Sequence, residues 1–483
     1  MTIPSSSSPF TLHPSPLFAH VDAHRDAFLE RLFAYLRMPS ISAHGTGVAE
    51  TAGFLEGLLD GMGLAVERPE TPGWPVLVGR RAGPAEAPLA TPTVLLYGHY
   101  DVQPPDPIEL WRSPPFEPEI RDGRIYARGA GDNKGQHFAQ LLALETLLAV
   151  DGELPCSVIV VLEGEEEIGS PHIAEVVRAN RDRLRADLVI TSDGPVHESG
   201  RPTVELGVRG VLSFELRARG ANRDLHSGNF GGIAPNPIWT LVHLLATMKS
   251  DAGDISIDKF HDGIVPPSDA ELDAISSLPL DLAGSLAALG IDRLDAPAER
   301  GYYERLMTFP TLTINGLHGG YGGPGSKTVL PGEAVAKCDA RLVSDQDPDA
   351  VFAAIAAHVA RHAPEVEVIH QGAMAPSKTP IDSPFVAPVL AGVRAATGEE
   401  PLLVPAMGGS LPEYVWTKIL GVPALVVPYA NHDEDNHAPN ENIEVERFVT
   451  GIKTGIAMLL ELGKMQRSGA GWGGPAADDA PST

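Results

Sequence analysis

The sequence is short of cysteine, of long apolar runs and of positive charge, and each shortage excludes a class of protein. The two cysteines, Cys156 and Cys338, cannot form a disulfide framework and have no metal-pair spacing, so we expect both to be buried in a cytoplasmic protein. No apolar run approaches the ~20 residues that span a bilayer. The net charge of −27 argues against nucleic acid and anionic membrane as partners.

The length and the two ends of the chain set its general organisation. A chain of 483 residues is too long for one ordinary core and predicts two domains or more. The Ser/Pro-rich segment from Met1 to Pro16 lacks the basic start and apolar stretch of a secretory signal. We expect residues 1 to about 18, and the tail at 468–483, to be flexible.

Strands and helices alternate in the first part of the chain. Short β-rich runs and helically spaced apolar residues follow one another, which predicts βαβ units and an α/β domain with a mostly parallel sheet. The predicted strands are residues 93–97, 157–162 and 187–190, and the predicted helices are residues 22–36, 49–62 and 136–150.

The pattern changes near residue 209 and changes back near residue 376. Between these points the strands alternate apolar and polar residues, as strands with one buried face do, which predicts an α+β module with an antiparallel sheet. Its predicted strands are 211–219, 311–314, 335–342 and 366–370, and its helices are 237–249 and 349–362. We therefore predict one domain from residues 1–208 and 377–467, interrupted by an inserted module at 209–376.

Five short acidic or histidine-bearing segments lie at turn-like positions, and three of the first four directly follow a predicted buried strand. They are Gly98–Asp101, Gly131–Gly135, Glu163–Glu167, Thr191–Gly194 and Asn436–Glu441. Ligands of open α/β sheets collect outside the carboxyl ends of the strands. Imidazole and carboxylate are ligands that Zn²⁺ and Mn²⁺ accept. Together the segments predict one hydrolase site with two metals.

Each of these residues also has an ordinary structural interpretation. His99 and Asp101 suit a surface turn, Asp132 suits a helix N-cap, and Glu165–Glu167 suit a solvated acidic loop. In the functional interpretation, His99 binds metal and is oriented by Asp101. Asp132 bridges two metals, and its glycine neighbours allow close approach of the backbone.

The remaining residues of the predicted site complete two sets of ligands. One of two adjacent glutamates can bind metal while the other polarises its water. Asp193 and His437 supply the missing ligands. Each residue alone is weak support, and their joint occurrence favours the functional interpretation.

The order and spacing of these motifs resemble those of the M20 metallopeptidases, and within them the carnosinase-like cytosolic non-specific dipeptidases. The most specific segment runs from Trp111 to Gly135 and reads WRSPPFEPEIRDGRIYARGAGDNKG. The resemblance covers nearly the full length. It implies a zinc-peptidase α/β catalytic domain, split in sequence by a lid or dimerisation domain.

The resemblance also implies two divalent metal ions per chain, with zinc as the first expectation and manganese as the alternative. It assigns His99, Asp132 and Asp193 to one metal and Asp132, Glu167 and His437 to the other. Glu166 becomes the general base and Asp101 the aspartate that supports a ligand. The Asp132–Asn133 peptide matches a bond that is often cis in the family.

Four residues outside these motifs are implied to contact substrate. By resemblance, His226 reaches the active site of a partner subunit and holds the substrate carbonyl, which implies a homodimer. Thr328, Arg341 and Ser410 match substrate-binding positions, with Arg341 and Ser410 at the substrate carboxylate. Taken alone, His226 and Arg341 suit exposed surface positions. Gly408–Ser410 lacks the Gly-Lys-Ser/Thr ending of a phosphate loop.

The chain departs from the family pattern just before His437. The longer acidic approach from Asn431 to Asp435 contains His432, which could be mistaken for the ligand, but His-x-Pro-Asn-Glu favours His437. We predict a dinuclear metal-dependent dipeptidase that cleaves the amide bond of dipeptides or short peptides, with Glu166 as base for a metal-activated water. The alternatives are an M20-type hydrolase of N-acyl amino acids, a carboxypeptidase and, more distantly, a non-catalytic scaffold.

Overall fold

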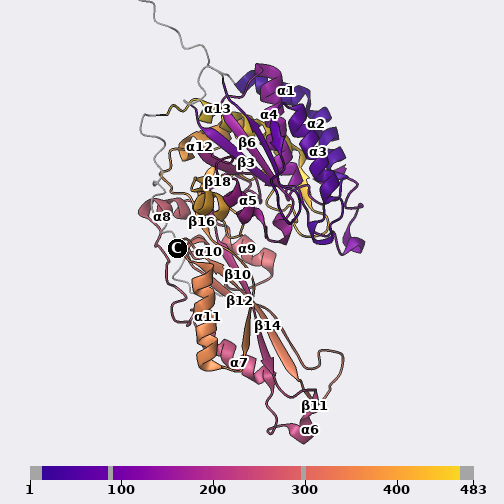
Figure 1. Cartoon of the computed structure of the whole chain (residues 1–483), viewed down its shortest axis with the longest axis vertical. Helices are drawn as coiled ribbons and strands as arrows, with labels where there is room; N and C mark the ends of the chain where they lie inside the picture. Colours follow the sequence, from indigo (N-terminus) through magenta and orange to yellow (C-terminus); the bar gives the residue numbers. More distant parts are fainter. Residues whose placement is uncertain (1–13, 85–90, 295–300, 468–483) are drawn as a thin grey trace, which may run out of the picture. The chain divides into compact units, whose positions relative to one another are not determined.

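The chain forms two compact units, described here from a computed structural model of residues 14–84, 91–294 and 301–467 (Figure 1). Unit 1 comprises Met1–Leu206, Thr379–Leu403 and Val415–Thr483, and unit 2 comprises Gly207–Lys378 and Val404–Tyr414. Residues 1–13 and the tail at 468–483, both predicted to be flexible, lie outside the described residues. Residues 14–18 differ from the prediction, because they begin the first helix.

The segment Val404–Tyr414 belongs to unit 2, whereas the sequence places it in the first domain. Two arginines of unit 2 hold it. Arg209 donates from Nε to the carbonyl oxygen of Gly408 at 2.8 Å, and Arg341 donates to the hydroxyl of Ser410 at 2.8 Å. These bonds join residues some 70 to 200 positions apart, which local sequence patterns do not reveal.

The main sheet of unit 1 is parallel at its centre and antiparallel toward its edges. The strand order is β1-β2-β6-β3-β7-β18-β8-β17, and β6, β3, β7 and β18 run parallel. β1, β2 and β8 pair antiparallel with their neighbours, so the predicted parallel arrangement holds for the four central strands. The strands are β1 (Ala65–Glu67), β2 (Leu77–Arg81), β3 (Thr93–His99), β6 (Ser157–Glu163), β7 (Leu188–Thr191), β8 (Thr203–Glu205), β17 (Leu402–Val404) and β18 (Ala424–Val426). A smaller antiparallel sheet contains β4 (Glu119–Arg121), β5 (Arg124–Tyr126) and β19 (Asn442–Glu444).

Helices of unit 1 follow the predicted apolar spacing with one difference. The predicted helix at 22–36 is two helices, because the backbone of His24 leaves the helical conformation between them. No described helix is both long enough and apolar enough to cross a membrane. The helices are α1 (Pro14–Ala23), α2 (Arg25–Leu36), α3 (Val48–Gly61), α4 (Lys134–Asp151), α5 (Ile173–Ala179), α12 (Val386–Thr397) and α13 (Val445–Gly463), with short helical turns at Ser42–His44, Ile108–Leu110 and Glu166–Ile168 and a π-helix at Val415–Leu420.

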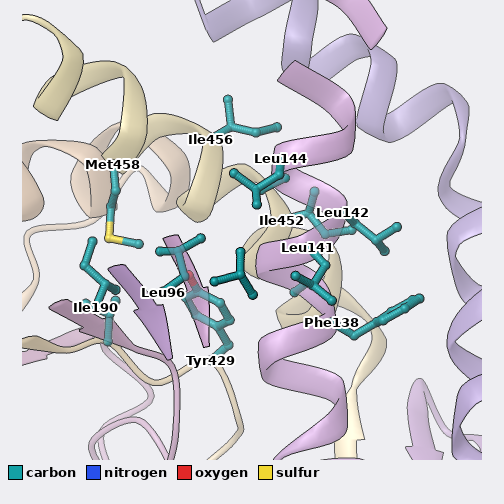
Figure 2. Close-up of a cluster of buried hydrophobic side chains, with 14 of the residues drawn as sticks. Leu96, Phe138, Leu141, Leu142, Leu144, Ile190, Tyr429, Ile452, Ile456 and Met458 are labelled. Atoms are coloured by element: carbon teal, nitrogen blue, oxygen red, sulfur yellow. The ribbon is translucent and has the colours of Figure 1, made fainter. Parts of the chain in front are cut away.

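The core of unit 1 lies between the central strands and the pair α4 and α13 (Figure 2). Met458 of α13 points toward Ile190 of the sheet, Leu144 of α4 and Ile456 of α13 lie where the two helices meet, and all four side chains are buried. Each such side chain contributes about 1.5–3 kcal/mol by leaving water. This packing fixes the central strands, whose carboxyl ends carry the predicted site.

Unit 2 is built on a four-stranded antiparallel sheet with the order β12-β14-β10-β15. The inward residues of β10 and β14 mostly alternate with half-buried or exposed ones and pack with α7 and α11 into a second core. The strands are β9 (Gly207–Val208), β10 (Gly210–Arg219), β11 (Leu225–His226), β12 (Thr311–Gly319), β13 (Val329–Leu330), β14 (Glu333–Leu342), β15 (Glu367–Met374) and β16 (Ser377–Lys378), and the helices are α6 (Ser227–Phe230), α7 (Pro237–Met248), α8 (Asp269–Ser276), α9 (Leu282–Leu289), α10 (Tyr302–Thr308) and α11 (Pro348–His362).

Close packing of α12 against α13 yields a stability prediction at Gly392. A Cβ atom there would lie 2.6 Å from Cα of Met458, so Gly392→Ala should lower the free energy of unfolding by about 1–3 kcal/mol through overpacking. Gly57 of α3 is the matched control, because a Cβ atom there meets nothing within 4 Å, and Gly57→Ala should stabilise by about 0.4–1 kcal/mol. Urea unfolding of unit 1 in both variants measures this. Equal effects of the two substitutions would contradict the packing.

Candidate metal centre

The predicted site residues of unit 1 converge at the carboxyl ends of three parallel strands. In the ladders of these strands, His99 of β3 pairs with Glu163 of β6, and Tyr97 of β3 pairs with Thr191 of β7, so the three strands end at one edge. The following residues therefore emerge together. They are His99 at the end of β3, Glu166 and Glu167 after β6, Asp193 after β7, Asp132 before α4 and His437 before β19.

Asp132 lies between two groups of ligand-type side chains. Its Oδ1 is 3.1 Å from Nε2 of His99, and that nitrogen is 3.3 Å from Oδ2 of Asp193. Its Oδ2 is 3.0 Å from Nε2 of His437, and that nitrogen is 3.1 Å from Oε2 of Glu167. One carboxylate thus faces two sets of donors, one through each oxygen.

Burial concentrates negative charge around Asp132. Burial, with the charge of Asp132, raises the pKa of Glu167 to about 7, and burial raises the pKa of Asp193 as well. Contacts with Asp132 and Glu167 raise the pKa of the half-exposed His437 to about 11. The buried carboxylates outnumber the imidazoles near them, so the cluster has an excess of negative charge that a bound cation would offset.

The donor set fits two divalent cations. His99, Asp132 and Glu167 offer ligand atoms that lie within 4.8 Å of one another. Oδ2 of Asp193 is buried and, apart from its 3.3 Å contact with Nε2 of His99, meets no hydrogen-bond donor of a described residue, although buried carboxylate oxygens nearly always have one. Two positive ions sharing Asp132 would satisfy this oxygen and offset the crowded charge.

Asp101 contacts His99 at Nδ1, the ring nitrogen that does not face Asp132. Its Oδ1 lies 3.3 Å from Nδ1 of His99, and its two oxygens accept from the backbone N–H groups of Glu166 and Glu167 at 3.2 and 3.0 Å. Gln103, which sequence reasoning missed, donates from its backbone to Oε1 of Glu167 at 3.1 Å and from its amide to Oε2 at 2.9 Å. Its position two residues after Asp101 is the only feature of the sequence that could have indicated a role for Gln103 at this site.

Glu441 is the second residue whose role the sequence does not reveal. It ends the His-x-Pro-Asn-Glu motif and is fully buried. Its carboxylate accepts from the guanidinium of Arg128 at 2.6 Å and from the backbone N–H groups of Gly129, Gly131 and Asp132 at 3.0, 2.9 and 2.9 Å. Glu441 therefore ties the loop that presents Asp132 to the segment that presents His437.

A buried chain of hydrogen bonds also links Asp132 to Asp193. Asn133 donates to the carbonyl oxygen of Ser192 at 2.6 Å. His137 contacts the Asn133 side chain at 3.1 Å and the hydroxyl of Tyr35 at 3.0 Å. The Asp132–Asn133 peptide is cis, as the resemblance implies.

The four predicted substrate residues of unit 2 form two separate pairs. Nε2 of His226 lies 3.5 Å from the hydroxyl of Thr328, and His226 is exposed beside the β11–β13 ladder. Arg341 donates to Ser410 at 2.8 Å, and its Nε lies 3.7 Å from Asp339. Each pair combines residues far apart in sequence.

The hydrogen bonds of Glu441 yield a prediction about metal retention. Glu441→Gln replaces an oxygen that faces backbone N–H groups with an amide donor, so the Asp132 loop should loosen. We expect metal loss to a chelator to become at least about tenfold faster, since hydrogen bonds to charged groups contribute about 1.5–3 kcal/mol each. Stopped-flow chelation of the metal-loaded protein measures this.

Glu434 provides the matched control. It is also buried beside Gly131, but neither carboxyl oxygen has a hydrogen-bond donor, and burial beside Asp132 and Glu441 raises its pKa well above the usual range. Gln is close in shape to the neutral acid, so Glu434→Gln should retain metal as the wild type does. Similar chelation rates for both variants would contradict the role of Glu441.

Comparison with known proteins identifies the family. The model of Peptidase family M20/M25/M40 matches residues 95–461. Human Beta-Ala-His dipeptidase is 28% identical over 95% of this chain and 95% of its own length, and a Cys-Gly metallodipeptidase of Candida albicans is 30% identical over 91% and 95%. The crystal structure of an M20 family metallo-carboxypeptidase from Sulfolobus solfataricus has a TM-score of 0.85 at 34% identity, covering 90% of this chain and 99% of that chain. The motifs, the α/β fold and these matches agree, and the chain belongs to peptidase family M20.

Proposed function

We propose that the protein is a metal-dependent dipeptidase that hydrolyses the amide bond of dipeptides or short peptides. The observation that carries the proposal is the position of Asp132, one carboxylate shared by two sets of ligand-type residues. The names of the human and Candida relatives, both dipeptidases, support the substrate class. We also propose zinc as the metal, with manganese as the alternative, and a cytoplasmic location, which the two free buried cysteines support.

In this proposal Glu166 and Glu167 have different roles. Two divalent cations, when bound, lower the pKa of water and polarise a carbonyl. Gln103 and His437 already hold the carboxylate of Glu167, which suits a ligand. Oε2 of Glu166 lies 3.9 Å from Nε2 of His99, and no hydrogen bond to a described residue holds this carboxylate. Glu166 is therefore free to take a proton from the attacking water and return it to the leaving amine.

Arg341 and Ser410 support recognition of a free carboxylate on the substrate. The planar guanidinium of Arg341 suits bidentate capture of a carboxylate, and Ser410 beside it offers a further donor. Such a pair would bind the C-terminal end of a peptide. Dipeptides, longer peptides and N-acyl amino acids all carry this group, so other contacts must select among them.

A carboxypeptidase is the second candidate function. The structural relative from Sulfolobus solfataricus, described as a metallo-carboxypeptidase, is 34% identical to this chain. A hydrolase of N-acyl amino acids would use the same metal ligands and the same carboxylate contact. A non-catalytic scaffold is the weakest alternative, because every predicted ligand and Glu166 are present.

A substrate panel tests the proposed function. The zinc-loaded and the manganese-loaded protein should each be assayed on Ala-Ala, Ala-Ala-Ala, N-acetyl-Ala and N-benzyloxycarbonyl-Ala-Ala. We expect kcat/KM for Ala-Ala to exceed that for the N-blocked compounds at least about tenfold, because a site that pairs a free amine rejects substrates without it. Preference for N-benzyloxycarbonyl-Ala-Ala would instead support the carboxypeptidase.

Variants of the adjacent glutamates show whether the same centre catalyses the reaction. Glu166→Ala should retain metal and fold but lose about 10²–10⁴ in kcat, the usual contribution of a general base. Glu167→Ala should instead lose metal affinity. If Glu166→Ala remains within a few-fold of the wild type, Glu166 is not the base.

We also propose a homodimer in which each site is completed by the partner subunit. The length of β10 in unit 2 supports this proposal, because the strand separates His226 from Arg341. Val211, at one end of β10, pairs with Arg341 of β14. Arg219, at the other end of β10, pairs with Glu333, which follows β13. His226 pairs with β13 and therefore lies near this second end. Eight residues of strand span about 26 Å at roughly 3.3 Å per residue. One chain therefore cannot bring both its His226 and its Arg341 to the same dipeptide.

The surface of unit 2 supports such a dimer. β12 is an edge strand, and Ile314 on it is 52% exposed. Trp239 on α7 is 59% exposed, and Leu317 of β12 is also exposed. An unpaired edge with exposed large apolar side chains is typical of a surface that another chain covers.

Mixing two inactive variants tests the trans arrangement. His226→Ala should lower kcat by about 10²–10³ through loss of an oxyanion donor. A mixed dimer of His226→Ala and Glu166→Ala chains has one site with an intact base and an intact histidine from the other chain. Activity should therefore return after subunit exchange. A fully active monomer, or no recovery when exchange is verified by mass spectrometry, would refute the arrangement.

A further inference from the structure

Unit 2 contains a second concave site with an excess of positive charge. The cavity has a volume of about 370 Å³, which suits a small molecule. Among the described residues, its charged lining includes Arg209, Lys249, His261 and Arg305, against one acid, Asp254. A basic cavity is unexpected in a chain with a net charge of −27.

Arg209 is a buried guanidinium without a carboxylate partner. It is 8% exposed, and its Nε donates to the carbonyl oxygen of Gly408, while no described residue accepts from its two terminal nitrogens. Burial and the neighbouring charge of Arg341 lower the pKa of Arg209 to about 10. The charge of Asp339 acts on this pKa in the opposite direction but forms no ion pair with Arg209, and a buried charge without such a partner favours an anion beside it.

Arg305 is a second basic residue of the cavity, and one of its hydrogen-bond donors is unsatisfied. It lies on α10, and its Nη1 is buried without a hydrogen-bond acceptor among the described residues. No ion pair with a described residue engages its guanidinium. Buried donors are almost always paired, and two guanidinium groups that line one cavity, each with a terminal nitrogen from which no described residue accepts, point to an acceptor in that cavity.

The apolar residues that line the rest of the cavity indicate what kind of molecule the anionic group belongs to. Tyr302, Leu306, Phe309 and Leu312 line the cavity with apolar surface. A bare inorganic anion would leave this surface in contact with water, whereas an apolar body would cover it. The guanidinium fork matches the geometry of a carboxylate.

We propose that this cavity binds a small molecule with a carboxylate attached to an apolar body, held by Arg209 and Arg305. The site differs from the proposed substrate contact, because neither Arg341 nor Ser410 lines the cavity. The two sites are neighbours, because Thr311, the partner of Arg341 in the β12–β14 ladder, lines the cavity, but the guanidinium of Arg341 is bonded to Ser410 outside it. The inference does not depend on the proposed peptidase activity.

The test uses 3-phenylpropionate as the probe and isothermal titration of the full-length, metal-loaded protein. An Arg341→Met background removes the proposed substrate contact from the measurement. Adding Arg305→Met should weaken binding at least about tenfold, because charge-assisted hydrogen bonds are the strong ones. Adding Arg219→Met instead, on an arginine whose side chain is 69% exposed, should change the affinity less than twofold.

Two further probes define the ligand class. Phenethylamine lacks the carboxylate and inorganic phosphate lacks the apolar body, so both should bind at least about tenfold more weakly than 3-phenylpropionate. Equal or tighter binding of either probe would overturn the proposal. So would an affinity for 3-phenylpropionate that Arg305→Met leaves unchanged.

Two readouts separate ligand binding from a structural role of Arg305. Without probe, Arg305→Met should melt at the same temperature as the wild type or higher, because it removes an uncompensated charge. A clear loss of stability would assign Arg305 to the fold and overturn the proposal. Crystals of the wild type grown with 3-(4-bromophenyl)propionate should show bromine in the cavity beside α10, and its absence there would also overturn it.

Discussion

The structure of unit 1 depends on keeping several carboxylates together in a place from which water is largely removed. Asp132, Asp193, Glu166 and Glu167 are drawn to one strand edge, and like charges in such surroundings repel strongly. The fold tolerates this because imidazoles and backbone N–H groups reach the cluster, and because the arrangement offers two places for cations. Charge balance, more than apolar packing, therefore explains the composition of this edge.

Backbone hydrogen bonds make the arrangement rigid. Asp101 accepts from the two glutamates and contacts His99, and Glu441 accepts from the loop that presents Asp132. Asp101 joins the end of β3 to the residues after β6, and Glu441 joins its own segment to residues 128–132. The central parallel strands set the approximate place of the ligands, and these two acids set their final positions.

Local sequence patterns predict the strands, the long helix α4 and the segments that follow the strands, because apolar periodicity and strand ends are local features. The same patterns predict one metal site from five segments, and the resemblance to the M20 metallopeptidases assigns His99, Asp132, Glu167, Asp193 and His437 as its ligands. The contributions of Gln103 and Glu441 were not predictable, since Gln103 donates to a carboxylate 64 residues away and Glu441 accepts from a backbone N–H group 309 residues away. The place of Val404–Tyr414 in unit 2 likewise results from tertiary contacts, those with Arg209 and Arg341.

The central claim is that one carboxylate, Asp132, serves two cations at once, and counting bound metal tests it most directly. Elemental analysis of the purified protein, combined with anomalous diffraction at the metal edge, should give two ions per chain about 3.5–4 Å apart. The Asp132→Ala protein, folded by circular dichroism, should lose both ions together. Saturation of the wild type at one ion per chain, or an Asp132→Ala protein that retains one ion at full affinity, would contradict the account.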